Sequence, residues 1–104
     1  DFPIESINPL KTFYAAVFRK DIEGFPAEGF QIENALTREQ ALKSITIWAA
    51  KGSFEESKKG SIEPGKLADF VVLNQDIMKV SESELLKTNV LVLYSSGEKV
   101  YQIQ

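Results

Sequence analysis

The sequence predicts an α+β fold in a chain of 104 residues, long enough for one domain at most. Three observations carry this prediction. Two stretches have apolar residues at helical spacing, residues 67–73 form a nearly unbroken apolar run, and the C-terminal residues form two strand patterns around Gly97. The predicted order is therefore helix, helix, strand, short helix and hairpin.

The first helix is predicted over residues 9–20, after an extended entry over residues 1–7 in which Pro3 disfavours helix and ladder pairing. Asn8 is suited to cap the helix, and Pro9 is suited to its first position. Arg19 and Lys20 stand where the helix dipole favours cations. One helical face collects the apolar side chains Leu10, Phe13, Tyr14, Val17 and Phe18.

Residues 21–36 have no sustained periodicity and predict a long loop, with a short turn near residues 30–33. A loop of this length suggests a functional or covering role, although a surface loop without function is the favoured interpretation. The second helix is predicted from Thr37, which forms a capping box with Gln40, to Gly52 in a left-handed conformation. Its apolar face comprises Ala41, Leu42, Ile45, Trp48 and Ala49.

The stretch from Gly60 to Asn74 predicts a rigid turn that leads into a strand buried on both faces, central in a small sheet. Ser81 and Glu84 form a second capping pattern, which predicts a short helix to about Lys87. Residues 90–94 and 99–103 are predicted to pair as a hairpin.

Composition excludes several kinds of chemistry. The chain has neither Cys nor His, so it contains no thiolate, no imidazole base and no sulfur or nitrogen ligand from these side chains. A Ser or Cys triad of the usual His-dependent type is therefore excluded within this chain. The net charge is −3 without a basic patch, which argues against nucleic acid as a partner. No apolar run approaches the roughly 18 residues that span a bilayer, so no membrane is expected as a partner.

Three side chains are candidates for function, and each has a structural interpretation beside it. Asp69 is the one charge in the apolar run, but a structural role in bonding the preceding turn is favoured over chemistry. Lys66 could bind a phosphate, although the phosphate-loop motif is absent and a solubilising surface lysine is favoured. Trp48 could form a ligand box with the aromatic residues of the first helix, but a place in the core is the commoner role.

The sequence also resembles a known family. GSIEPGKLADFVVLNQD is preceded by LTREQALKSITIWAAKGSFEE and followed by a hairpin ending in GEKVY. In combination these motifs resemble the carboxy-terminal part of the amidohydrolase superfamily, specifically the amidohydrolase 3 family, over nearly the whole chain. The residues that carry the resemblance are Thr46, Ala49, Gly60, Gly65, Lys66, Ala68, Asp69 and Gly97.

The resemblance implies a piece of a larger enzyme. In this family a metal-bearing (β/α)8 barrel is joined to a composite β-sandwich built from both chain ends. By this match, residues 1–59 are the C-terminal end of the barrel, with its last helices, and residues 60–104 are the C-terminal strands of the sandwich. Asp1 corresponds to the aspartate at the end of the last barrel strand, which implies a catalytic role in proton transfer or a place among the metal ligands.

The family's other ligands, an HxH pair, a lysine or glutamate in mid-barrel and two later histidines, have no counterpart here. The resemblance therefore implies no cofactor bound by this chain alone, and a divalent metal, with zinc as the expected ion, in the longer parent. It implies hydrolysis of amide or related C–N bonds by that parent, and an inactive chain by itself. The expected partners are the rest of the parent or a second copy, and a small-molecule substrate in the parent. The alternatives are a free-standing α+β interaction module and a structural subunit of a separately encoded barrel.

Overall fold

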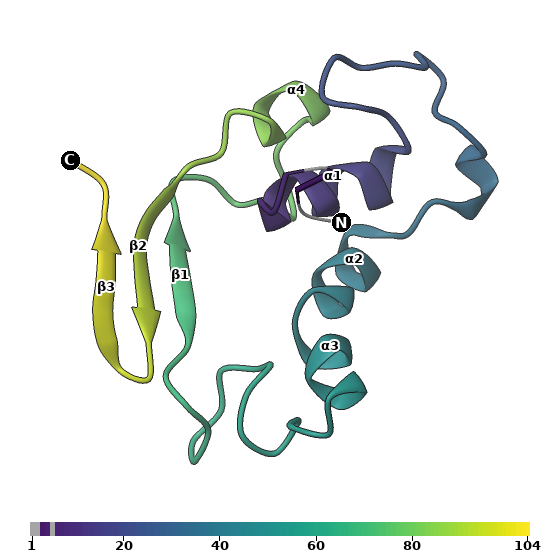
Figure 1. Ribbon diagram of the computed structural model, residues 1–104. Coiled ribbons are helices and arrows are strands. Elements are labelled where there is room, and N and C mark those ends of the chain that lie inside the picture. The colour runs from purple at the N-terminus through teal and green to yellow at the C-terminus, as the bar shows by residue number, and fades with distance from the viewer. Residues whose placement is uncertain (1–2, 5) are drawn as a thin grey trace.

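The structure is a computed structural model, which describes residues 3–4 and 6–104, and it has the α+β architecture that the sequence predicts. The sheet lies at one side of the molecule and the helices at the other (Figure 1). Along the chain the elements are α1 (Pro9–Phe18), the 3₁₀ helix η1 (Ile32–Asn34), α2 (Arg38–Ser44), α3 (Ile47–Gly52), β1 (Phe70–Leu73), α4 (Glu82–Leu85), β2 (Val90–Ser95) and β3 (Glu98–Gln102).

Helix α1 begins as predicted and ends earlier. The Asn8 side chain accepts a hydrogen bond from the Leu10 N–H, and Pro9 occupies the first turn. The helix stops at Phe18 because Arg19 is left-handed, with φ of 56°. Arg19 is held there by the long loop: its Nε donates to the Phe30 carbonyl at 2.9 Å, and the Phe30 N–H donates to the Arg19 carbonyl at 2.7 Å. The predicted extension to Lys20 is therefore wrong.

The predicted helix over residues 37–52 is two helices, α2 and α3. The capping box is confirmed, with Thr37 and Gln40 bonded reciprocally. The break follows from hydroxyl groups, since Ser44 Oγ donates to the Ala41 carbonyl and Thr46 Oγ1 donates to the Leu42 carbonyl, both at 2.7 Å. Such bonds compete with the helical ladder, and Thr46 stands between two β-branched isoleucines.

The end of α3 also differs from the prediction in its conformation. Gly52 is the last helical residue and does not have a positive φ, whereas Phe54, with φ of 61°, is left-handed. The predicted left-handed Gly52 is therefore wrong, although the position of the helix end is confirmed. None of the helices in residues 3–4 and 6–104 is long and apolar enough to cross a membrane.

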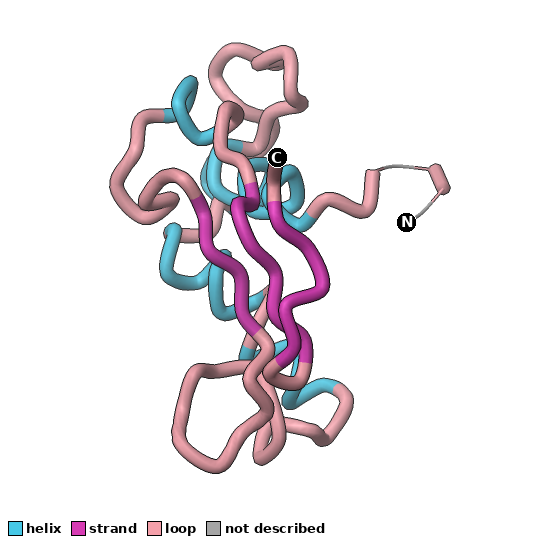
Figure 2. The backbone as a smooth tube through the Cα atoms, turned by 90° about the vertical axis from the view of Figure 1, so that its left-hand side faces the viewer, coloured by secondary structure: helices cyan, strands magenta, loops and turns pink. Residues whose placement is uncertain are grey.

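The sheet is three-stranded and antiparallel, in the order β1-β2-β3 (Figure 2). The β2–β3 hairpin is confirmed, and it turns through two left-handed residues, Ser96 and Gly97, as a two-residue hairpin loop requires. The prediction of a central strand before Asn74 is wrong. β1 lies at an edge of the described sheet, Val71 and Val72 are 47% and 42% exposed, and β2 is central.

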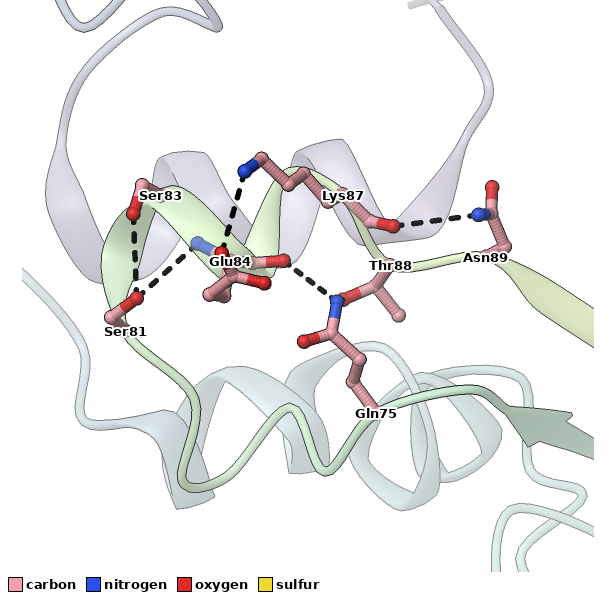
Figure 3. A network of polar contacts seen from close by, with 7 residues as sticks. All are labelled: Gln75, Ser81, Ser83, Glu84, Lys87, Thr88 and Asn89. Carbon is pink, nitrogen blue, oxygen red and sulfur yellow. Dashed lines mark hydrogen bonds and ion pairs between the residues drawn. The ribbon is translucent and has the colours of Figure 1, made fainter.

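Helix α4 is held by a local polar network (Figure 3). Ser81 Oγ accepts from the Glu84 N–H at 3.3 Å, which confirms the predicted helix start. Gln75 Nε2 donates to the Glu84 carbonyl at 2.9 Å and so ties the helix to the segment after β1. The connection between β1 and β2 is therefore anchored at both ends of α4.

The core is small for a chain of this length. It forms where α1, α2 and α4 meet, and its buried cluster comprises Phe13, Tyr14, Ala41, Ile77 and Leu85. Trp48 is 44% exposed, so its predicted place in the core is wrong. The total accessible surface is 7512 Å², against about 5,800 Å² expected for a folded monomer of this mass. The radius of gyration is 14.7 Å, against about 13 Å for a compact domain of this length. The chain is therefore less compact than a typical domain of its length, and many of its large apolar side chains are exposed.

Candidate functional site

Asp1, the residue predicted by resemblance to be catalytic or a metal ligand, lies outside the described residues, and its role stays a prediction. The described chain enters α1 through residues 6–8, where the Asn8 N–H donates to Ser6 Oγ at 3.2 Å. Within residues 3–4 and 6–104, no three or more carboxylates come together in a group that could hold a metal ion. The described residues therefore do not form a metal site, and no chemical step is assigned to a metal here.

Asp69, the candidate inside the apolar run, has a structural role, in agreement with the favoured interpretation. Its surroundings differ from those predicted. The side chain is exposed, and its Oδ1 accepts from the Ser96 N–H at 2.7 Å, in the turn between β2 and β3. The Gly97 N–H donates to the Ala68 carbonyl at 3.0 Å beside it. Asp69 thus fixes the hairpin turn to the start of β1, and not the preceding turn as expected.

Lys66 is part of the turn before β1. Its side chain is only 14% exposed, with Nζ 2.7 Å from Ser61 Oγ and 3.1 Å from Glu63 Oε2. Ser61 also donates to the Glu63 carboxylate. The hydrogen bond from Ser61, followed by that from Lys66 and its charge, lowers the pKa of Glu63. The expectation of a solubilising surface lysine is therefore wrong, because Lys66 holds the turn together.

A polar cluster that the sequence does not reveal joins α1 to α4. The Tyr14 hydroxyl donates to Glu82 Oε2 at 3.1 Å, and Lys20 Nζ lies 3.1 and 3.0 Å from the two oxygens of the same carboxylate. The Tyr14 side chain is 1% exposed. Burial, and then the hydrogen bond and charge of Glu82, raise the pKa of Tyr14. Glu82 is more than 60 residues away in the chain, and no sequence pattern connects residues at that distance.

A groove of about 840 Å³ lies between the α2–α3 helices and the β1–β2 part of the sheet. Its walls are mainly apolar, including Leu42, Ile45 and Ala50 from the helices and Phe70 and Leu93 from the strands. Polar residues also line it, among them Thr46, Ser53, Lys59, Ser61 and Asp69. The Asp69 carboxylate already accepts from the Ser96 N–H, and Lys59 is already paired with Glu55. This mainly apolar arrangement is suited to covering by another apolar surface.

A family model and several relatives match this chain. The sequence profile of the amidohydrolase family matches residues 1–101. An N-substituted formamide deformylase from Arthrobacter pascens is 34% identical over 102 residues, which are 98% of this chain and 18% of that protein. The protein LONG AFTER FAR-RED 3 of Arabidopsis thaliana is 33% identical over 105 residues, covering 97% of this chain and 17% of that protein.

A solved structure is also similar. The crystal structure of an amidohydrolase from Thermotoga maritima MSB8 superposes with a TM-score of 0.58 and 32% identity, over 69% of this chain and 17% of that one. This chain thus spans less than a fifth of the length of each of these relatives. Since the family profile matches nearly the whole chain, the chain belongs to the amidohydrolase family.

Proposed function

We propose that this chain is the C-terminal segment of a metal-dependent amidohydrolase that acts on non-peptide C–N bonds, and that it is inactive by itself. The observation that carries the proposal is the family match over residues 1–101. The chain aligns with less than a fifth of the length of each relative, which supports its being a segment of a longer enzyme. The name of the Arthrobacter relative, a deformylase of N-substituted formamides, supports the bond type.

In this proposal residues 1–59 complete a (β/α)8 barrel, and residues 60–104 contribute strands to a composite β-sandwich. The arrangement of elements supports the division, because α1, α2 and α3 precede residue 60 and all three strands follow it. The uncovered surface supports it as well. Large apolar side chains are exposed in both parts, among them Ile22, Phe25, Phe30, Trp48, Val71 and Val72. We propose that the rest of the parent hydrolase covers many of them.

Asp1 is proposed to contribute to the metal site of the parent, where the remaining ligands belong to other parts of the enzyme. A catalytic divalent ion generally needs three or more protein ligands. Since the described carboxylates form no such group, the chain alone is expected not to bind zinc at a defined ratio. The substrate is proposed to be a small molecule bound by the loops of the parent barrel.

Metal analysis and an activity assay on the purified chain test this proposal. After equilibration with zinc and dialysis, the expected result is less than about one bound zinc per ten chains, with no hydrolysis of an N-substituted formamide. Asp1→Asn is the matched control, and it should leave the retained zinc unchanged. One retained zinc per chain together with turnover would overturn the proposal.

The coding sequence upstream of Asp1 gives an independent test. An HxH motif some hundreds of residues earlier supports the amidohydrolase parent. A start codon directly before Asp1, or an unrelated upstream domain, would contradict it and favour a free-standing interaction module. If the barrel is encoded separately, copurification of the two chains would identify this one as a structural subunit.

A further inference from the structure

The β1–β2 connection, residues 74–89, lies between two strands of the sheet but packs with the helices. It leaves the sheet after β1, carries α4 and returns as β2. Its Ile77 and Leu85 side chains are 7% and 2% exposed and belong to the same buried cluster as side chains of α1 and α2. We infer that this connection joins the sheet to the helices so firmly that residues 1–59 and residues 60–104 unfold as one cooperative unit.

Polar contacts hold the connection from the helical side. Glu82 of α4 accepts from the Tyr14 hydroxyl at 3.1 Å, and its two carboxylate oxygens lie 3.1 and 3.0 Å from Lys20 Nζ. Arg38 Nη1, at the start of α2, donates to the Ile77 carbonyl at 2.9 Å. The Lys20 side chain is only 16% exposed, so solvent screens its ion pair less than it screens a surface pair. The connection is therefore bonded to the helices as well as packed against them.

The two ends of the connection are bonded to each other where they meet the sheet. The Asn74 N–H donates to the Asn89 carbonyl at 3.1 Å, and the Asn89 N–H donates to Asn74 Oδ1 at 2.9 Å. Asn74 directly follows β1, and Asn89 directly precedes β2. Gln75 then ties this closed base to α4 through the Glu84 carbonyl. Because the base has little slack, a displacement of α4 should be passed to the two strands.

Other links between the sheet and the helices are looser in the described structure. The groove of about 840 Å³ lies between the α2–α3 helices and the β1–β2 part of the sheet. Every residue of β3 is exposed. Gly60 packs closely against α3, but it lies well before β1 in the chain. The attachment of the sheet therefore depends mainly on residues 74–89.

This joining has a consequence for the parent enzyme, which rests on the proposed function. Residues 74–89 would belong structurally with the end of the barrel, although they lie between strands of the sandwich. The sandwich strands could then not shift against the barrel end without opening the buried cluster. The cooperative joining itself concerns the 104-residue chain and does not depend on hydrolase activity.

Native-state hydrogen exchange on the 104-residue chain, followed by NMR, tests the inference. Tyr14→Phe removes the hydroxyl and keeps the ring, and it should speed the slowest amides of α1 and those between β1 and β2 by the same factor, about fivefold. Lys20→Met should speed both groups equally, by about threefold or more. Lys43→Met is the matched control, because its partner Glu39 lies in the same helix and both side chains are exposed. It should change either group by less than about twofold.

The unmodified chain gives a second measurement that needs no variant. Exchange of the slowest amides in α1 and in the β1–β2 pair should depend on urea with the same slope, because one cooperative unit exposes the same surface in each case. Different slopes would overturn the inference. So would faster exchange in α1 with unchanged exchange in the sheet, or no effect of Tyr14→Phe and Lys20→Met in either region. None of these results bears on the proposed hydrolase parent, so the two proposals can fail separately.

Discussion

The Asp69 carboxylate accepts a hydrogen bond from the backbone N–H of Ser96 at 2.7 Å, and so joins the start of β1 to the turn between β2 and β3. Ser96 is left-handed, with φ of 51°, which is an uncommon conformation for a residue with a side chain. The carboxylate thus holds a turn of uncommon backbone conformation. This explains the single charge in the apolar run without assigning it any chemistry.

Replacement of Asp69 by alanine should therefore destabilise the chain by about 1 kcal/mol, the net value of one hydrogen bond. Asp69→Asn should lose less stability, because the amide oxygen can still accept from the Ser96 N–H. Urea denaturation of the two variants measures the difference. Equal losses in both variants would show that the hydrogen bond is not what Asp69 contributes.

The hydroxyl of Tyr14 gives a second prediction for stability. Tyr14→Phe removes the hydrogen bond to Glu82 and keeps the ring in the core, so a loss of about 1 kcal/mol is expected at neutral pH. Tyr101→Phe is the control, because Tyr101 is 47% exposed on β3. That variant should be as stable as the unmodified chain, and a similar loss from both substitutions would contradict the role of the Tyr14 contact.

The pH dependence of this contact has a definite sign. Because burial and Glu82 raise the pKa of Tyr14, the folded state keeps the phenolic proton when the unfolded state has lost it. The stabilisation is complete below the ordinary tyrosine pKa of about 10 and is lost as the pH rises through the folded value. The advantage of the unmodified chain over Tyr14→Phe should therefore shrink above about pH 10, as denaturation at a series of alkaline pH values would measure. A constant advantage would contradict the shift.

Gly60 is expected to be intolerant of any side chain. Its φ is 99°, and an added Cβ would lie 2.8 Å from the Ala50 Cβ and 3.0 Å from the Ile47 Cα. Gly60→Ala combines backbone strain with a clash against α3 and should cost roughly 2 kcal/mol or more. Gly52→Ala is the control, since Gly52 lies in α3 with open space around it and alanine favours the helix. Thermal denaturation should show a lower melting temperature for Gly60→Ala only, and not for Gly52→Ala.

The half-exposed ion pair of Glu55 and Lys59 gives a prediction for acid titration. The hydrogen bond from Lys59, and then its charge, lower the pKa of Glu55. Any stabilisation from this pair is present above the ordinary glutamate pKa and is lost as the pH falls through the folded value. In a carbon-detected NMR titration, Lys59→Gln should return the pKa of Glu55 to its ordinary range. The same titration midpoint in both proteins would rule out the pair in solution.

Local signals in the sequence predicted helix starts well, because capping depends on residues at most four positions apart. Asn8 with Pro9 begins α1, Thr37 with Gln40 caps α2, and Ser81 caps α4. Helix ends were harder to predict. Arg19 ends α1 through bonds to Phe30, eleven residues further along, and such a contact leaves no periodic signal.

The candidate functional residues were also predicted only in part. The sequence identified Asp69 as structural, but it could not supply Ser96 as the partner, nor join Tyr14 and Lys20 to Glu82. Each of these contacts spans 27 or more residues and exists only once the elements are packed. Asp1, the residue that resemblance alone assigns to chemistry, lies outside the described structure and stays a prediction.

By itself the sequence determined the family, the α+β class and the positions where most elements begin, because motifs and caps are properties of short stretches. Only the tertiary structure decided that the apolar strand before Asn74 lies at an edge, that the helix after Thr37 breaks at Thr46, and that Trp48 is exposed. The physical reason is that an apolar run indicates that a strand needs burial, but it does not indicate which element covers the strand. In the described structure β2 pairs with one side of β1, and no described strand pairs with its other side.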